Sequence, residues 1–344
     1  MRPNAELKLH FVNVNHGDCT IVEFPDHGAA HLAHLAVIDF GAKKAVDRGL
    51  ARDYLRQLAE LRRDGDPAFD FVIEFACVTH PHDDHYGGLT RFLDVFADPL
   101  DPVNNKIRAF WDCGFRTNAI DYNEGLSRVA QNAHIAFTRV GSGMEVELGG
   151  TRVTVLGPSV DLRNRFDTYG IGKNDASVVL KVKFGDAFAI LAADAEYASW
   201  GKITEEFPRT QNINFFSDAI GLSERGETSD QLKCGLLKLS HHGSKHGSSL
   251  EYLERLKPRH VVIPAGSQPW YQANLSNWAG KFPHPLIRQT LQELDSTIDL
   301  RVTGETGNLI YKFTGNSSTP REVAVIAARP DDPAFPAELA ARWP

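Results

Sequence analysis

The stretch Val78-Thr79-His80-Pro81-His82-Asp83-Asp84-His85-Tyr86-Gly87-Gly88 places three histidines and two aspartates in six consecutive positions. The run before it, residues 71–78, is rich in β-branched and aromatic side chains, which predicts a largely buried strand. Pro81 lacks the N–H that a sheet ladder requires, so we expect the strand to end before it. The polar cluster is therefore predicted to lie on a loop at a strand end.

Imidazole and carboxylate groups at this density indicate a metal site. His80 and His82 flank a proline that fixes the backbone between them, whereas Asp84 and His85 are adjacent and must point in different directions. Such a loop can serve two metal centres, with His80 and His82 at one, Asp84 and His85 at the other, and water or hydroxide between them. The alternative, a polar loop that collects histidines by chance, explains this spacing much less well.

The H-x-H-x-D-H pattern of residues 80–85 resembles the hallmark loop of the metallo-β-lactamase superfamily. The resemblance implies an α/β fold, a metallo-β-lactamase-type αββα sandwich in which two mixed sheets are flanked by helices. We expect residues 1–315 to form this hydrolase domain. Residues 316–344 begin with the run Asn-Ser-Ser-Thr-Pro, so we expect a short C-terminal linker and appendage there.

Four further segments resemble, more narrowly, the hydrolase domain of ComEC-type DNA-uptake proteins. They are F-V-N-V-N-H-G-D-C-T-I-V (11–22), N-D-A-S-V-V-L (174–180), I-L-A-A-D (190–194) and L-K-L-S-H-H-G-S-K (237–245). The last two are apolar, strand-like runs that lead into Asp194 and into the pair His241-His242. The chain departs from this family at His16, where the family has glutamine.

The resemblance implies that these segments complete the metal set. Asp194 takes the position of the superfamily's metal-bridging aspartate, and one of His241 and His242 should complete the second metal site. We favour His241 as the ligand, with His242 turned towards the scissile bond, and the pattern leaves the reverse assignment open. The expected metal ligands are His80, His82, Asp84, His85, Asp194 and His241.

Other residues are predicted to act around this set. Catalytic roles are expected for Asp84, His242 and His284. His284 would act as a general acid or stabilise the transition state. Alternatively, His284 caps a helix over residues 286–294. Substrate binding or support of the ligands is expected from Asp18, Asp39, Asn174, Ser244 and Lys245. A hydrogen-bonded turn explains Asp18 equally well, and Lys245 can also be a solvated surface lysine.

Two divalent metal ions, Zn²⁺ or Mn²⁺, are the expected cofactors. The imidazoles suit zinc, while the carboxylates and a first site that is short of one histidine would suit manganese. With such ions the predicted chemistry is hydrolysis by a metal-bound hydroxide, without a nucleophile from the protein.

The ComEC-type resemblance implies a phosphodiesterase or nuclease that acts on a phosphodiester, either DNA or a small nucleotide. The formal net charge of −7 argues against a broadly basic surface that coats nucleic acid, and keeps the small nucleotide open. A small ester, lactone or thioester is the alternative substrate. A partner-gated, metal-binding regulatory module is a second alternative, motivated by the C-terminal segment and by an aromatic, Asn-rich loop over residues 270–281.

The cellular compartment is predicted from the cysteines and the N-terminus. Four scattered cysteines without a C-x-x-C pair are typical of reduced core residues. Residues 1–6 lack the apolar segment of a signal peptide, and no stretch of the sequence is long and apolar enough to cross a bilayer. We therefore expect a cytoplasmic, bacterial protein with no membrane partner.

Overall fold

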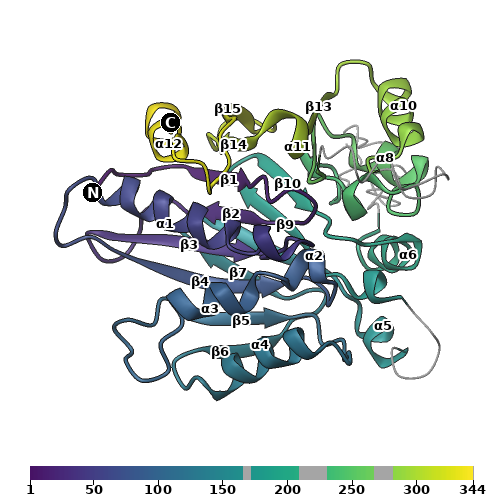
Figure 1. The fold of residues 1–344 in the computed structure, drawn as a ribbon. Helices are drawn as coiled ribbons and strands as arrows, with labels where there is room; N and C mark the ends of the chain where they lie inside the picture. The colour runs from purple at the N-terminus through teal and green to yellow at the C-terminus, as the bar shows by residue number, and fades with distance from the viewer. Residues whose placement is uncertain (166–171, 209–230, 267–281, 344) are drawn as a thin grey trace, which may run out of the picture.

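The computed structural model describes residues 1–165, 172–208, 231–266 and 282–343. Within these ranges two β-sheets lie face to face, and helices cover the outer face of each sheet (Figure 1). Both faces of each sheet carry apolar side chains, so both faces must be covered by another layer. The predicted αββα sandwich is confirmed. The loop over residues 270–281 lies outside the described residues.

The first sheet combines antiparallel and parallel strands. In chain order its strands are β1 (Leu7–Phe11), β2 (Thr20–Glu23), β3 (Leu32–Ile38), β4 (Asp70–Val78), β5 (Ala109–Asp112), β6 (Ala136–Arg139), β14 (Asn308–Phe313) and β15 (Arg321–Ile326). Across the sheet they are ordered β15-β14-β1-β2-β3-β4-β5-β6. Neighbours from β15 to β3 pair antiparallel, and β3 to β6 run parallel. The strand predicted over residues 71–78 is thus β4, an interior strand that ends before Pro81.

The second sheet is also mixed. Its strands are β7 (Glu145–Leu148), β8 (Thr151–Gly157), β9 (Val179–Phe184), β10 (Ala187–Leu191), β11 (Leu236–Lys238), β12 (His260–Ile263) and β13 (Asp299–Val302). They are ordered β13-β12-β11-β10-β9-β8-β7, with β7 to β10 antiparallel and β10 to β13 parallel.

Helices form the two outer layers. The first sheet is covered by α1 (Leu50–Arg63), α3 (Leu89–Phe96), α4 (Ile120–Gln131) and α12 (Phe335–Arg342), and the second by α6 (Tyr197–Glu206), α8 (Leu250–Leu256) and α10 (Pro285–Leu294). Shorter helices are α2 (Asp83–Tyr86), α5 (Val160–Arg165), α11 (Thr303–Thr306) and the 3₁₀ turns η1 (Ala45–Asp47), η2 (Lys173–Ala176) and η3 (Ser240–Gly243). Among the described helices, none has the length and apolar character that crossing a membrane requires.

The apolar periodicity of residues 46–63 produces α1. Its buried residues Leu50, Tyr54 and Leu58 lie on one face and pack into the core against the first sheet. The helix begins at Leu50 and not at Val46, because Val46 belongs to η1 and is 80% exposed. The helix therefore supplies one apolar face to the core.

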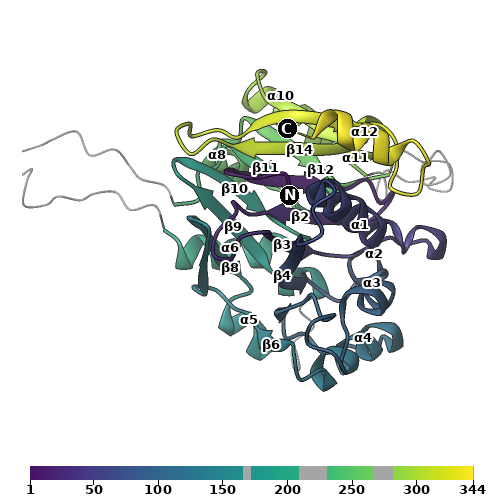
Figure 2. The same ribbon diagram turned by 90° about the vertical axis from the view of Figure 1, so that its left-hand side faces the viewer.

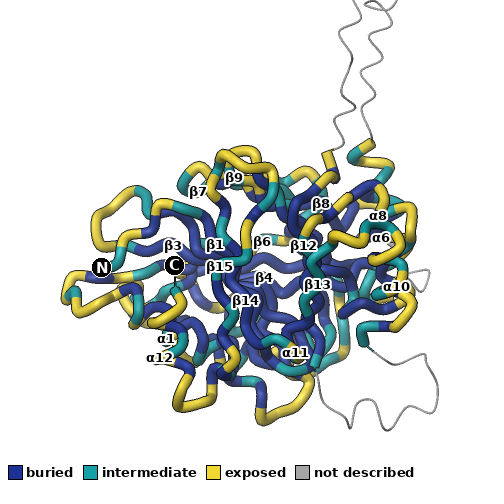
Figure 3. The backbone as a smooth tube through the Cα atoms, turned by 90° about the horizontal axis from the view of Figure 1, so that it is seen from above, coloured by how far each residue is buried: buried dark blue, intermediate teal, exposed yellow. Residues whose placement is uncertain are grey.

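A second apolar core fills the space between the sheets. Leu9 and Val22 of the first sheet and Val182 and Ala189 of the second belong to it, and all four side chains are fully buried. The tube in Figure 3 is dark blue along most of the central strands, which marks this buried layer. This packing fixes the two sheets against each other and so fixes the loops at their ends.

The C-terminal segment was expected to be a linker and appendage over residues 316–344, but its described part, residues 316–343, packs into the sandwich. β15 pairs with β14 at the edge of the first sheet, and α12 lies beside α1 (Figure 2). The ring of Phe335 in α12 is 5.1 Å from that of Tyr54 in α1, and Trp343 stacks under the ammonium of Lys8. These contacts bury the apolar residues of the segment and give it a place in the first helical layer.

Candidate metal centre

Loops that follow four strands meet at one edge of the sandwich. Asp39 follows β3, the loop of residues 79–85 follows β4, Asp194 follows β10, and η3 follows β11. β3 and β4 are parallel, as are β10 and β11, so the carboxyl ends of each pair lie at the same edge of their sheet. Such edges are common ligand sites in α/β proteins.

Asp194 lies at the centre of the cluster. Its Oδ1 is 3.2 Å from Nε2 of His85 and 3.8 Å from Nε2 of His242. Its Oδ2 is 3.6 Å from Nε2 of His80 and 3.8 Å from Nε2 of His241. Burial opposes the charge of this carboxylate, but the neighbouring imidazoles, foremost His85 and His242, hold its pKa well below the usual range.

Two groups of potential ligand atoms share Asp194. His80 and His82 form the first group with it, and their Nε2 and Nδ1 atoms are 3.0 Å apart. His85 and His242 form the second group with it. The atoms of each group lie within 4.8 Å of one another, and ligands held tetrahedrally at about 2.1 Å from zinc are roughly 3.4 Å apart. Each group can therefore close around one cation with small movements of its side chains.

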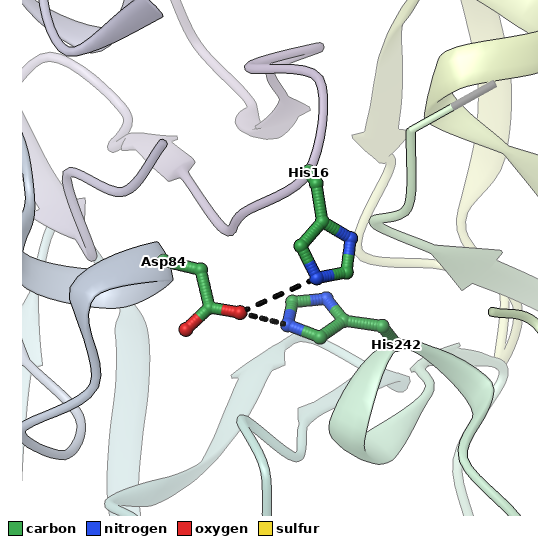
Figure 4. A group of neighbouring side chains, drawn as sticks. All are labelled: His16, Asp84 and His242. Carbon is green, nitrogen blue, oxygen red and sulfur yellow. Dashed lines mark ion pairs between the residues drawn. The ribbon is translucent and has the colours of Figure 1, made fainter. Parts of the chain in front are cut away.

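A third group contains Asp84, His16 and His242 (Figure 4). Oδ2 of Asp84 is 3.5 Å from Nε2 of His16 and 3.5 Å from Nε2 of His242. The three side chains come from the β1–β2 connection, from α2 and from η3, and they converge on one point. Burial, and then the neighbouring His242, lower the pKa of His16 to about 3, so the imidazole is neutral and can act as a ligand.

Asp39 fixes the orientation of His85. Asp39 accepts hydrogen bonds from the backbone N–H and the hydroxyl of Thr79, each at 2.8 Å, and its Oδ2 is also 2.8 Å from Nδ1 of His85. An ionised carboxylate can only accept, so Nδ1 of His85 carries a proton and Nε2 faces Asp194. A carboxylate behind a ligating histidine is the usual support at metal sites. Asp39 therefore lies directly behind His85, on the side of the ring away from Asp194.

A backbone carbonyl fixes His242 in the same way. Nδ1 of His242 is 2.5 Å from the carbonyl oxygen of Pro264, which can only accept a hydrogen bond. The other ring nitrogen, Nε2, therefore faces Asp84 and Asp194. The side chain is 1% exposed. His242 thus lies deeper in the cluster than His241, the histidine favoured as a ligand from the sequence.

His241 occupies the outer side of the cluster. It is 20% exposed, and its Nδ1 is 2.8 Å from Oε1 of Glu196. Asn174 donates its side-chain N–H to the same oxygen at 2.9 Å. Burial opposes protonation of His241, but the hydrogen bond with Glu196 and the charge of Asp194 outweigh it and raise the pKa. His241 is thus held by Glu196 with Nε2 towards the cluster.

The backbone of η3 separates the two histidines. His241 and His242 have φ values of 47° and 51°, in the left-handed region that residues other than glycine seldom adopt, and Gly243 follows at 77°. The N–H of His241 donates to the carbonyl of Ala193, and the N–H of Ser244 donates to the carbonyl of His241. Residues held in this region cluster at functional sites, because the surrounding structure must impose them. Here the turn sends adjacent side chains to different parts of one cluster.

Close backbone contact anchors the metal loop. A Cβ atom built on Gly41 would lie 1.5 Å from the carbonyl oxygen of Asp84, so no other residue fits at this position. Asp18 donates its backbone N–H to that same carbonyl and accepts from the N–H of Gly41. The carboxylate of Asp18 pairs with the ammonium of Lys238, and both side chains are 1% exposed. Asp18 therefore joins the two sheets beneath the loop and holds its backbone.

The remaining predicted residues lie further from the carboxylates. Nδ1 of His284 accepts the backbone N–H of Leu286 at 3.3 Å at the start of α10, the contact expected of a helix cap. The hydroxyl of Ser244 accepts the N–H of His246 within its own turn. Lys245 is exposed, and its carbonyl accepts from the hydroxyl of Tyr197. The structure thus brings Ser244 and His284 into local turn and cap contacts.

The donor atoms of the cluster fit a bound cation. Among the described residues, buried polar atoms without a hydrogen-bond partner include Nε2 of His85, Nε2 of His242 and Oδ1 of Asp194. All three point to the same space, because each of the two Nε2 atoms lies within 3.8 Å of Oδ1. Buried polar atoms are normally paired, and a divalent cation would satisfy all three at once.

His16 and Glu196 belong to this cluster but were not predicted as site residues. His16 was noticeable in the sequence only as a departure from the ComEC-type pattern. Glu196 lies two positions after Asp194, at the start of α6. A carboxylate is common at the start of a helix, so its presence there did not indicate a site residue. Sequence patterns could not place either residue, because each meets the cluster through a loop of irregular backbone.

Comparison with known proteins gives one family match and one curated relative. The family model described as the metallo-beta-lactamase superfamily matches residues 34–266. ComE operon protein 3 of Bacillus subtilis is 23% identical over 325 residues, which cover 92% of this chain and 34% of that protein. The chain thus spans about a third of the length of this relative.

Solved structures with similar folds share little sequence with the chain. The metallo-beta-lactamase fold protein YhfI from Bacillus subtilis has a TM-score of 0.46 and 9% identity, covering 90% of this chain and 100% of its own. CmlA, a diiron beta-hydroxylase from Streptomyces venezuelae, has a TM-score of 0.43 and 12% identity, covering 88% of this chain and 53% of its own.

Proposed function

The chain belongs to the metallo-beta-lactamase superfamily, and from this premise we propose that it is a metal-dependent hydrolase that cleaves a phosphodiester. The observation that carries the proposal is the convergence of the buried, unpartnered atoms of His85, His242 and Asp194 in one space. In this proposal the cluster would hold two divalent cations, and Asp194, which belongs to both groups of potential ligand atoms, would help to hold each of them.

The residues divide between the two proposed ions by position. His80 and His82 would hold the first with Asp194, and His85 and His242 the second, joined by Asp84. Bound there, the ions would supply Lewis acidity and a lowered pKa for coordinated water. Zn²⁺ and Mn²⁺ both suit a mixture of imidazole and carboxylate donors. His16 adds a neutral imidazole beside Asp84 that can serve as a further donor or contact the substrate.

The protein's own part in the reaction is to position groups. Asp39 and the Pro264 carbonyl bind Nδ1 of His85 and of His242, so that Nε2 of each ring faces Asp194. Glu196 holds His241 at the outer side of the cluster, where its Nε2 can contact a substrate oxygen. Groups held in this way need no rearrangement during the reaction, and that preorganisation lowers the barrier.

Three lysines around the cluster favour an anionic substrate over a neutral ester. Lys43 and Lys245 lie in loops, whereas Lys173 begins η2 and donates to the carbonyl of Pro81 at 3.4 Å. The charge of each lysine contributes to lowering the pKa of a nearby histidine. Lys43 acts on His16, Lys173 on His82 and Lys245 on His284. Positive charge at the mouth of a site attracts phosphate groups. The similarity to the ComEC-type hydrolase domain supports the same substrate class, with DNA or a small nucleotide as the candidates.

The test compares two adjacent aspartates. Asp84→Asn removes a carboxylate that faces His16 and His242, whereas Asp83→Asn makes the same change one residue earlier, outside the three groups. Metal content is measured by plasma mass spectrometry, and activity is measured on bis(p-nitrophenyl) phosphate, on single- and double-stranded DNA and on p-nitrophenyl acetate. We expect two metals per chain, and phosphodiester cleavage that is lost in Asp84→Asn and kept in Asp83→Asn.

Each other result rejects part of the proposal. Bound metal with hydrolysis of the acetate ester alone would place the substrate among esters, lactones or thioesters. Metal binding with activity that appears only after a partner protein is added would establish a partner-gated module. Phosphodiester cleavage that survives Asp84→Asn would remove the cluster from the chemistry.

A further inference from the structure

A cationic cavity lies on the second sheet, away from the metal cluster. It has a volume of about 740 Å³ and is bordered by β8, β9 and β10 and by the segments that precede β11 and β12. Residues 233–235, which precede β11, line it, whereas His241 and His242 follow that strand. The cavity and the metal cluster are therefore at opposite ends of the same strands.

The cavity opens on the outer face of the sheet. Val179 of β9 and Ile190 of β10 pack into the outer core beneath α6, α8 and α10. Side chains two positions apart on a strand point to the same face, so Lys181, Lys183 and Phe188 share that outer face beyond the part that the helices cover. Figure 3 shows where β7, β8 and β9 lie in the molecule.

The side chains that line the cavity carry a net positive charge, whereas the whole chain carries a net negative charge. The whole sequence has 37 basic and 44 acidic residues, so an average surface would carry slightly more negative charge. The lining has one acidic residue, Glu145, and its carboxylate already accepts the hydroxyl of Thr154 at 2.7 Å. Its six basic residues are Arg152, Lys181, Lys183, Lys233, Lys257 and Arg259.

Several of these cations lack a carboxylate partner. Arg152 is 3.7 Å from Glu147, and Arg259 is 3.7 Å from Asp295, in exposed pairs of little strength. In the part of the chain that the structure describes, no ion pair involves Lys183, Lys233 or Lys257. Like charges gathered in one cavity repel one another, and an anion placed among them would relieve that repulsion.

An aromatic ring lies among the cations. Phe188 is half-buried, and its ring centroid is 4.7 Å from the ammonium of Lys181 and 5.3 Å from that of Lys183. A groove that combines basic side chains with an aromatic ring suits a ligand with phosphates and a flat base. The cavity volume falls within the range of about 300–1,000 Å³ that is usual for small-ligand sites.

We propose that this cavity binds a phosphate-rich ligand of the nucleotide class, with phosphates among Lys183, Lys233 and Lys257 and a base against Phe188. The shared chemistry is a phosphorylated nucleoside, supplied either as a free nucleotide or as a short single-stranded segment. The proposal is independent of the hydrolytic activity, because the cavity contains none of the residues of the metal cluster.

Binding is measured by fluorescence anisotropy on the full chain, with a labelled dT12 oligonucleotide and with a fluorescent ATP analogue as probes. The test variant is Lys183→Ala with Lys233→Ala, two exposed residues of the cavity. The control is Arg56→Ala with Arg63→Ala on α1, which removes two positive charges from the opposite helical layer. Both variants change the net charge equally, so a difference between them reports the cavity.

We expect the cavity variant to bind dT12 more weakly than wild type and the control to bind it normally. Each single-strand phosphate contact contributes about −0.7 to the slope of log K against log salt, so loss of two contacts should make the slope less steep by about 1.4. Phe188→Leu should weaken both nucleotide probes and leave competition by inorganic tripolyphosphate unchanged.

The two sources of the ligand give different results. Equal affinity for the ATP analogue and for dT12 would assign the cavity to a free nucleotide, and much tighter binding of dT12 would assign it to a strand. The proposal is overturned if neither probe binds at millimolar protein, if the cavity variant binds like wild type, or if the control loses as much affinity. Insensitivity of both nucleotide probes to Phe188→Leu would remove the base from the proposal.

Discussion

Replacing His242 by alanine should deplete the protein of divalent metal far more than the same replacement of its neighbour His241. Both histidines lie in one turn and both face Asp194. The structure separates them: His242 also faces Asp84 and is 1% exposed, whereas His241 is held by Glu196 at the outer side.

The size of the difference follows from these contacts. Loss of a group that merely supports a ligand weakens metal binding by about 10- to 100-fold. Loss of a ligand itself should weaken metal binding by more than this range. In His242→Ala we therefore expect the affinity for the second ion to fall by at least about 100-fold, which is equivalent to about 2.7 kcal/mol. His241→Ala should cost about 10-fold or less, because Asp194 keeps its contacts with His80, His85 and His242.

The assay is competition with a chromophoric chelator, performed separately with Zn²⁺ and Mn²⁺, together with metal content after gel filtration. Circular dichroism of both variants controls for folding, since alanine at either position must still adopt the left-handed backbone of this turn. Equal metal loss in the two variants, or greater loss in His241→Ala, would refute the assignment of His242 as the ligand.

Three further predictions test how the site and its scaffold are held. Asp39→Asn should weaken metal binding about 10- to 100-fold in the same competition assay, because Nδ1 of His85 loses the carboxylate that accepts its hydrogen bond. Unchanged metal affinity would contradict the role of Asp39 in orienting His85. Glu23→Gln should destabilise the fold by about 3 kcal/mol in urea at pH 7, because the buried guanidinium of Arg62 loses its ion pair with Glu23 and keeps only the one with Asp26. Burial opposes the charge of Glu23, but His10, Lys8 and Arg62 lower the pKa of its carboxyl to about 2, below the ordinary 4.5. The stabilisation that Glu23 provides is therefore complete above pH 4.5 and is lost as the pH falls towards 2. If the difference in stability between wild type and Glu23→Gln grew in acid, this role of Glu23 would be wrong. Lys238→Met alone should lower the free energy of unfolding more than the double change Lys238→Met with Asp18→Asn. The single change leaves the buried carboxylate of Asp18 without its partner. If the effects of the two single changes simply add in the double variant, the two side chains are not a coupled pair.

Local patterns in the sequence predict the strands and the groups at their ends. Residues 71–78 carry the composition of a buried strand, and Pro81 ends it, so the position of His80 and His82 at a strand end follows without any long-range information. The same reasoning places Asp194 and the His241-His242 pair, because an apolar run precedes each of them.

Other features depend on packing that no local pattern encodes. The C-terminal segment resembles a linker because its start is polar, yet β15 pairs with β14 at the edge of the first sheet and α12 packs against Tyr54 of α1. An edge strand needs only a few apolar residues to be stable beside an existing sheet, so its own sequence signal is weak.

The sequence by itself determined the αββα class and the set of histidines and aspartates available for metal binding, because strand patterns and their terminal residues are local properties of the chain. Only the tertiary structure decided that His242 lies deeper than His241, that His16 and Glu196 join the cluster, and that six basic residues line one cavity on the second sheet. Those facts are distances between segments remote in sequence, and such distances are set by how the two sheets and their helices pack together.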